Sequence, residues 1–157
     1  LKMAEKAGLK TLVLNPKDFG SKEDFDKEIV INLKKRDIGL VALAGYMRLL
    51  TPYFIKEYRN RILNIHPALL PAFKGKNGVK DAFNYGVKVT GPTVHFVTED
   101  IDSGPIVSQA AVLVKAGDKE ESLRERIHKE EHKIYTKAIK DFAESKLKII
   151  GKKVFNK

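Results

Sequence analysis

The sequence predicts an α/β fold in which a mostly parallel sheet is covered by helices on both faces. Segments of strand length alternate with segments of helical periodicity along the first half, and this alternation is typical of parallel sheets. Residues 38–44 form a continuous apolar run, which indicates a strand buried on both faces. The chain has 157 residues, 43% of them hydrophobic, which suffices for one core. We therefore expect a single domain over residues 1–157.

The first half of the chain alternates helix and strand. In order, we expect a helix over residues 1–7, a strand over 11–14, a helix from Ser21, a strand over 38–44, a helix from Thr51 and a strand over 61–65. Ser21 is followed by Asp24 at the spacing of a capping box, and Thr51 precedes a proline at the first helical position. The residues of the helix from Ser21 that we expect in the core are Phe25, Ile29, Val30 and Leu33.

The second half has shorter links between its predicted strands, so we expect these strands to join the sheet as antiparallel additions. In order, the elements are a helix over residues 79–85 ended by Gly86, strands over 93–97 and 106–114, a long helix from Asp118 and a hairpin over 146–155 that turns at Gly151. Asp118 and Glu121 repeat the capping-box spacing. The apolar stripe of the long helix is Leu123, Ile127, Ile134, Ala138 and Phe142.

The charge balance is strongly basic, with 30 basic and 20 acidic residues and a net charge of +10. Basic proteins often bind nucleic acid, but these lysines are spread among acidic residues, and no basic block is interleaved with aromatics. We interpret the charge as a solvated surface that attracts small anions, and we expect no nucleic-acid partner. No apolar run approaches the roughly 20 residues of a membrane span, so we expect no membrane partner. Cysteine is absent, which excludes disulfides, thiolate metal sites and cysteine nucleophiles and fits a cytoplasmic location.

The segment Asn64-Ile65-His66-Pro67 is the strongest candidate for an active site. It ends a predicted strand, and strand ends are where open α/β sheets hold ligands. Asn64 offers a donor for a developing oxyanion, His66 can move a proton, and Asp102 can pair with the histidine. Because no cysteine is present and no serine stands beside a base, this trio suits attack by a substrate's own nucleophile on a carbonyl-like carbon. The structural alternative is that Asn64 and Asp102 form turns and His66 is a polar strand end.

The other three histidines carry weaker predictions. His95 lies in a predicted strand, and we interpret it as a hydrogen-bonded histidine within the sheet. His128 and His132 are four residues apart on the long helix, a spacing that can bind a metal ion. No third ligand accompanies them, so we expect no metal site.

Several short motifs occur in one order along the chain. They are Ala44-Gly45-Tyr46-Met47-Arg48-Leu49-Leu50, Asn64-Ile65-His66-Pro67-Ala68-Leu69-Leu70-Pro71, Phe73-Lys74-Gly75, Thr90-Gly91, Thr93-Val94-His95-Phe96-Val97, Asp102-Ser103-Gly104-Pro105-Ile106, Gly117-Asp118 and Glu131-His132-Lys133-Ile134. With these motifs, essentially the whole chain resembles the glycinamide ribonucleotide formyltransferase family, also called the phosphoribosylglycinamide formyltransferases, which are folate-dependent enzymes of purine biosynthesis.

The resemblance implies a Rossmann-like fold and transfer of a formyl group from the cosubstrate 10-formyltetrahydrofolate to the amine of glycinamide ribonucleotide. It implies that Asn64 and His66 hold the oxyanion, and that Asp102 tunes His66 and assists proton transfer through water. The residues implied to bind the folate are Lys22, Met47, Arg48, Leu49, Leu50, Asn64, Thr98, Glu99, Asp100, Ile101 and Asp102. Pro67 and Glu131 are implied to contact the ribonucleotide, and the structural alternative for Glu131 is a solvated helix carboxylate.

The sequence departs from the family at its start. The family's first strand, glycine-rich phosphate loop, next helix and second strand have no counterpart. We therefore expect a domain truncated at its amino terminus, apolar sheet edges and incomplete activity of the isolated chain. A homodimer or a complementing chain is the expected partner. The alternatives are a formyltetrahydrofolate hydrolase, which transfers the formyl group to water, and an inactive fragment that binds folate or a partner chain.

Overall fold

The computed structural model describes all 157 residues. The helices are α1 (Lys2–Lys6), the 3-10 helix η1 (Pro16–Asp18), α2 (Lys22–Lys34), α3 (Pro52–Glu57), α4 (Gly78–Tyr85) and α5 (Glu120–Ala143). The strands are β1 (Val41–Leu43), β2 (Ile62–His66), β3 (Val89–Thr90), β4 (Thr93–Phe96), β5 (Ile106–Gln109), β6 (Val112–Leu113), β7 (Leu147–Ile150) and β8 (Lys153–Asn156). None of the helices combines the length and the hydropathy that a membrane crossing requires.

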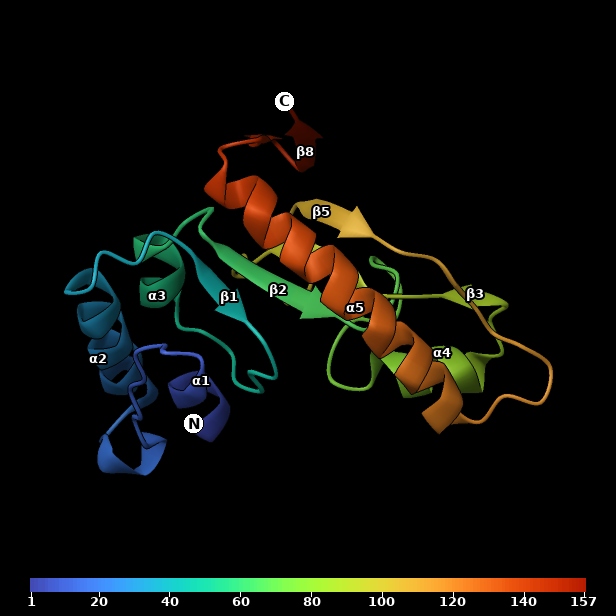
Figure 1. Cartoon of the computed structure of the whole chain (residues 1–157), viewed down its shortest axis with the longest axis horizontal. Helices are drawn as coiled ribbons and strands as arrows, with labels where there is room; N and C mark the ends of the chain where they lie inside the picture. The colour runs from blue at the N-terminus through green and yellow to red at the C-terminus, as the bar shows by residue number, and fades with distance from the viewer.

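Six strands form one mixed sheet in the order β1-β2-β4-β5-β8-β7, and β3 pairs with β6 outside it. The pairs β1·β2 and β5·β8 are parallel, whereas β2·β4, β4·β5 and β7·β8 are antiparallel. Figure 1 shows α5 running across the sheet along β2, with α2 and α3 beside β1. The α/β class is confirmed, and so is the antiparallel entry of the later strands.

Helices cover both faces of the sheet because side chains alternate along its strands. Ile62 of β2 packs in a cluster with Val30 of α2 and with Phe54 of α3. Its neighbour Leu63 points the other way and packs with Ala138 of α5. A third cluster joins α4, β6 and the amino-terminal half of α5. The sheet therefore separates an α2/α3 layer from an α5 layer, as the sequence predicts.

Local sequence signals set several element boundaries correctly. The Ser21 hydroxyl accepts a hydrogen bond from the Asp24 amide at 3.0 Å, and the Thr51 hydroxyl caps α3. Gly86 ends α4 in the left-handed conformation, with a φ of +83°. The terminal hairpin turns at Gly151, as expected.

The strand predicted over residues 11–14 is wrong. These residues have no regular structure, and Leu12 and Val13 are 49% and 66% exposed. One edge of β1 is free of a paired strand, but residues 11–14 do not pair with it or with any other strand. Apolar composition alone therefore misled the prediction.

Three other boundaries also differ from the prediction. The run over residues 38–44 contributes only the three residues of β1, and Ala42 is exposed, so this strand is not covered on both faces. The strand predicted over 106–114 is two strands, β5 and β6, which belong to different sheets. The capping pair predicted at Asp118 is shifted, because the Ser122 hydroxyl accepts from the Lys119 amide, while Asp118 binds Arg126.

Tyr135 ties α5 to the centre of the sheet. Its hydroxyl lies 2.8 Å from the carbonyl oxygen of Leu43 and 3.0 Å from that of Leu63, both in the parallel pair β1·β2. Burial raises the pKa of Tyr135, so its hydroxyl keeps the proton that it donates. This contact fixes the backbone immediately before Asn64.

We expect Tyr135→Phe to lower the free energy of unfolding by about 1–2 kcal/mol, because two carbonyl oxygens lose their donor while the ring stays in place. Urea denaturation followed by circular dichroism measures the loss. The matched control is Tyr53→Phe, since the half-exposed Tyr53 makes no hydrogen bond through its hydroxyl. Equal losses in the two variants would contradict the role given to Tyr135.

Candidate active site

The pairing of β2 with β4 brings together three polar side chains. Asn64 and His66 lie two residues apart on β2 and therefore point to the same face. In the antiparallel register Asn64 lies opposite His95, so the His95 side chain joins them. His66 and His95 are 3% and 2% exposed, whereas Asn64 is half-buried. The trio lies on the face opposite α5, because Leu63 and Val94, which directly precede Asn64 and His95, pack against that helix.

Asp102 reaches these side chains from the loop between β4 and β5. Its φ of +47° is unusual for a residue with a side chain, although Asp and Asn tolerate this conformation. The Gly75 amide donates to its Oδ2 at 2.7 Å. Beside it, the Lys74 ammonium donates to the Ser103 hydroxyl at 2.6 Å. The loop after β2 therefore holds the Asp102 loop in place.

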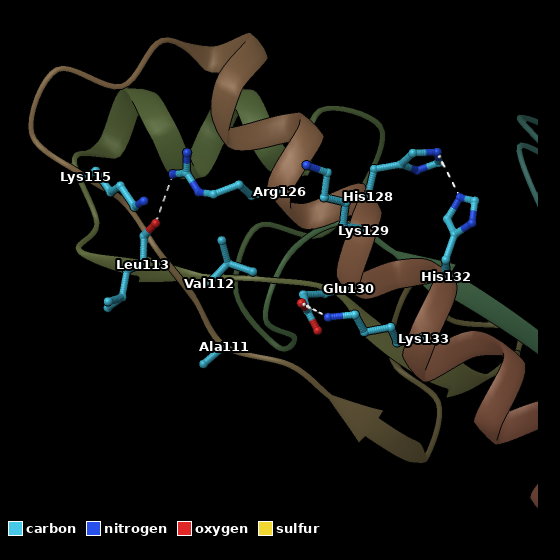
Figure 2. Close-up of a pocket in the computed structure, with 10 residues that line it drawn as sticks. All are labelled: Ala111, Val112, Leu113, Lys115, Arg126, His128, Lys129, Glu130, His132 and Lys133. Carbon is cyan, nitrogen blue, oxygen red and sulfur yellow. Dashed lines mark hydrogen bonds and ion pairs between the residues drawn. The ribbon is translucent and has the colours of Figure 1, made fainter.

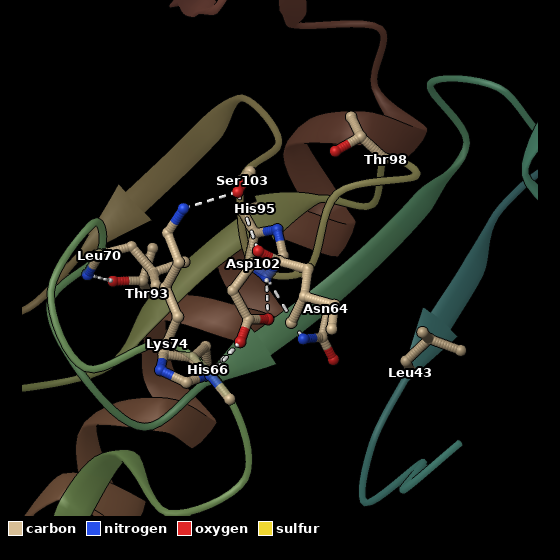
Figure 3. Close-up of polar contacts among 12 residues, drawn as sticks. Leu43, Asn64, His66, Leu70, Lys74, Thr93, His95, Thr98, Asp102 and Ser103 are labelled. Atoms are coloured by element: carbon tan, nitrogen blue, oxygen red, sulfur yellow. Dashed lines mark hydrogen bonds and ion pairs between the residues drawn. The ribbon is translucent and has the colours of Figure 1, made fainter. Parts of the chain in front are cut away.

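The Asp102 carboxylate lies between the two imidazoles (Figure 3). Its Oδ2 is 3.4 Å from Nδ1 of His66, and its Oδ1 is 3.5 Å from Nε2 of His95. The Asn64 amide nitrogen lies 3.3 Å from the same His95 Nε2. The predicted Asn64, His66 and Asp102 thus gather at one place, with His95 as a fourth member.

Main-chain carbonyls determine which imidazole nitrogens carry protons. The Phe73 oxygen lies 2.8 Å from Nε2 of His66, and the Phe96 oxygen lies 2.9 Å from Nδ1 of His95. A carbonyl oxygen only accepts, so both of these nitrogens are assigned as donors. The nitrogens that face Asp102 then carry a proton only when the ring is an imidazolium. The carboxylate is positioned to stabilise that proton on either ring.

The pKa of the Asp102 carboxyl lies below its ordinary value. Burial acts to raise this pKa, but the polar contact with the His95 ring, the hydrogen bond from the Gly75 amide and the nearby His66 together lower it by more. The group is therefore a carboxylate at neutral pH. It provides the one fixed negative charge between the two rings.

Close packing leaves little freedom in this loop. A methyl group at Gly104 would stand 1.8 Å from the Phe96 carbonyl oxygen, so no side chain fits at that position. Phe96 precedes the loop on β4, and Gly104 follows Asp102 by two residues. The close approach of Gly104 to Phe96 therefore holds the two ends of the loop that carries the Asp102 carboxylate together.

Two loops beside this cluster carry most of the residues predicted to bind folate. Between β1 and α3, Met47 and Leu49 are 71% and 59% exposed, while Leu50 packs into the α2/α3 cluster. The Arg48 guanidinium lies 5.2 Å from the centre of the Phe25 ring, so its side chain packs on α2. In the other loop Ile101 is 51% exposed. The rest of that loop comprises the half-buried Thr98, whose hydroxyl donates to the Asp100 carbonyl, and the exposed Glu99 and Asp100.

The remaining predicted residues lie farther from Asp102. Lys22 is the half-buried first residue of α2 and has no polar contact with the cluster. Pro67 follows His66 directly and is half-buried. Glu131 lies on α5, and its carboxylate contacts His128 rather than Asn64, His66 or Asp102. A cavity of about 670 Å³ runs along α5 beside β6 and contains none of the predicted catalytic residues.

His95 is the site residue that sequence reasoning missed. The sequence predicts a hydrogen-bonded histidine within the sheet, and the bond to Phe96 agrees with that. Its second nitrogen, however, faces Asp102 and Asn64. What reveals its role is the antiparallel pairing of β4 with β2, because this register places His95 opposite Asn64.

Comparison with known proteins identifies the family. Residues 1–139 match the formyl transferase family. The phosphoribosylglycinamide formyltransferase of Bacillus subtilis is 43% identical over 140 residues, covering 89% of this chain and 72% of the relative. The human trifunctional purine biosynthetic protein adenosine-3 is 47% identical over 139 residues, which are 88% of this chain and 14% of that protein. The chain therefore spans about one seventh of the trifunctional relative.

Solved structures give the same result. Glycinamide ribonucleotide transformylase 1 from Symbiobacterium toebii matches with a TM-score of 0.96 and 48% identity, over 99% of this chain and 73% of that one. A formyltetrahydrofolate deformylase from Pseudomonas syringae matches with a TM-score of 0.89 and 29% identity, over 99% of this chain and 52% of that one. The sequence resemblance is confirmed: the chain belongs to the formyl transferase family, among the phosphoribosylglycinamide formyltransferases.

Proposed function

We propose that this protein transfers the formyl group of 10-formyltetrahydrofolate to the amine of glycinamide ribonucleotide, a step of purine biosynthesis. The observation that carries the proposal is the Asp102 carboxylate between His66 and His95, with the Asn64 amide beside them. The cluster has proton carriers and an oxyanion donor but no nucleophile. It therefore suits a reaction in which one substrate attacks the other.

In the proposed reaction, the amine nitrogen of the ribonucleotide attacks the formyl carbon. The carbonyl oxygen becomes an oxyanion that the Asn64 amide stabilises as a donor and the His66 imidazolium stabilises by its positive charge. The bond from the formyl carbon to the folate nitrogen then breaks. The attacking amine loses a proton and the departing folate nitrogen gains one, and Asp102 carries this transfer through a water molecule. The products are the formylated ribonucleotide and tetrahydrofolate.

The exposed apolar side chains on the two loops support the folate part of the proposal. Met47, Leu49 and Ile101 are each more than half exposed, from loops on either side of the cluster. Apolar side chains gathered on loops at a polar site are typical of a surface that a flat aromatic ligand covers. We propose that the segment 47–50 and the loop 98–102 hold the pterin, with Lys22 near the folate. Pro67 and Glu131 are proposed to contact the ribonucleotide.

The choice of formyl acceptor tests the proposal against hydrolysis. We expect tetrahydrofolate to form from 10-formyltetrahydrofolate only when glycinamide ribonucleotide is present, with one formyl group transferred per folate. The assay compares initial rates with and without the ribonucleotide and identifies the formylated product by mass spectrometry. Formate release at a rate that ignores the ribonucleotide would favour a hydrolase. Folate binding without any turnover would favour an inactive folate-binding fragment.

Several expectations about the protein stay predictions. They are the single domain over residues 1–157, a homodimer or a complementing chain as partner, and a cytoplasmic location.

A further inference from the structure

The solvent face of α5 carries a pair of imidazoles that the proposed reaction does not use. His128 and His132 stand one turn apart, and their Nε2 atoms are 3.0 Å from each other (Figure 2). The ring centres are 4.4 Å apart and the rings are nearly perpendicular, at 82°. The His128 side chain is 66% exposed, so the gap between the two nitrogens is open to solvent.

A carboxylate behind the pair sets the tautomer of the neutral His128 ring. Oε2 of Glu131 lies 2.9 Å from Nδ1 of His128. A carboxylate only accepts, so Nδ1 donates, and Nε2 of the neutral ring directs a lone pair toward His132. The hydrogen bond between the two Nε2 atoms then uses a proton on His132. A single proton therefore lies between the Nε2 atoms of His128 and His132.

We propose that His128 and His132 bind one divalent late transition-metal ion, such as Zn²⁺, Ni²⁺ or Cu²⁺, in place of that proton. Two zinc–nitrogen bonds of about 2.0–2.1 Å at a tetrahedral angle separate the nitrogens by about 3.3 Å. A small side-chain rotation widens the observed separation of 3.0 Å between the two Nε2 atoms to this value. Imidazole ligands select these metals over Mg²⁺ and Ca²⁺, which prefer oxygen.

Glu131 supplies the outer contact that metal-binding histidines commonly have. A ligating imidazole usually donates its other N–H to a carboxylate or a carbonyl, which orients the ring and strengthens its basicity. The sequence offers no third ligand and so predicts no metal site. The structure gathers no group of three or more potential ligands either, so water completes the coordination of a two-imidazole site.

The charges around the pair are nearly balanced. Lys133 forms an ion pair with Glu130 at 2.7 Å. Lys129 lies between the two histidines in sequence and lines the same cavity. Its positive charge opposes a bound cation, whereas the Glu131 carboxylate favours one. The net effect of nearby charge is therefore small, and the two imidazoles dominate the affinity.

Titration of the whole chain with Zn²⁺ at neutral pH tests the site by calorimetry. We expect one ion per chain, and we expect His128→Gln and His132→Gln each to abolish that one-to-one binding. Glu131→Gln weakens binding about tenfold, because it keeps both ligands and removes only the carboxylate behind them. Lys129→Gln is the matched control on the same helix turn, and it binds at least as tightly as the parent chain.

Histidine ring signals in heteronuclear NMR spectra locate the ion independently of affinity. We expect the rings of His128 and His132 to shift on addition of Zn²⁺ while those of His66 and His95 do not. One-to-one binding that survives His132→Gln overturns the proposal. Binding lost in Asp102→Asn but retained in both helix variants overturns it as well, because the ion then lies between His66 and His95.

Discussion

Replacement of His66 by Gln is expected to reduce kcat for formyl transfer about a thousandfold, which corresponds to about 4 kcal/mol of transition-state stabilisation. Gln keeps an N–H group that can reach the Phe73 carbonyl, which His66 contacts at 2.8 Å. It cannot become a cation, so it neither stabilises the developing oxyanion as an imidazolium does nor carries a proton. The loss therefore reports on chemistry rather than on the lost hydrogen bond.

Steady-state kinetics with both substrates separate these effects. We expect KM for each substrate to change little, because the ring is 3% exposed and offers little surface for binding. Lys80→Gln, at an exposed position on α4, serves as the control substitution. Thermal unfolding of both variants shows whether the fold is intact. A well-folded His66→Gln protein with near-parental kcat would remove His66 from the mechanism.

Replacement of Asp102 by Asn is expected to reduce kcat about a hundredfold. Asn is the matched substitute because it tolerates the φ of +47° that Asp102 adopts, so the loop keeps its conformation. Its amide oxygen still accepts from the Gly75 amide, but the negative charge between the two rings is gone. An imidazolium at either ring then lacks its partner. Unchanged kcat with an unchanged fold would contradict the role of Asp102 in proton transfer.

The same variant has a distinct effect on stability at low pH. The pKa of Asp102 is lower in the folded protein than in the unfolded chain, so its ionisation stabilises the fold above the ordinary carboxyl range. This contribution is lost as the pH falls below about 4 and through the folded pKa. We therefore expect the difference in unfolding free energy between parent and Asp102→Asn to be largest near neutrality and to shrink in acid. A difference independent of pH would show that Asp102 stabilises the fold without its charge.

The sequence predicted elements best where the determining interactions are local. The caps at Ser21 and Thr51 involve residues within three positions, and both are present in the structure. Residues 11–14 illustrate the opposite case. An apolar segment becomes a strand only where it pairs with another strand, and pairing of this kind is not encoded in the segment itself.

The residues of the candidate site also fall into those that a local pattern reveals and those that depend on distant segments. Asn64 and His66 stand out because a polar pair closes an apolar strand, and that pattern can be read along the chain. His95 could be recognised only from the register of β2 with β4, which is a relation between distant segments. The main-chain contributions of Phe73 and Gly75 were invisible for a similar reason, since any residue type offers a carbonyl or an amide. Glu131 is predicted from family resemblance alone, and its contact in the structure is with His128.

Asp102 collects its contacts from segments that are remote along the chain. Its carboxylate meets His66, the Gly75 amide and His95, so β2, the loop that follows it and β4 must all be in place before these contacts exist. Pairings of long sequence separation form only after a large loss of chain entropy has been overcome, and they are typically completed when the whole domain is ordered. The arrangement of the candidate site is therefore a property of the cooperative native state and not of any local piece of the chain. Folding of the central sheet and acquisition of the chemical centre are one event.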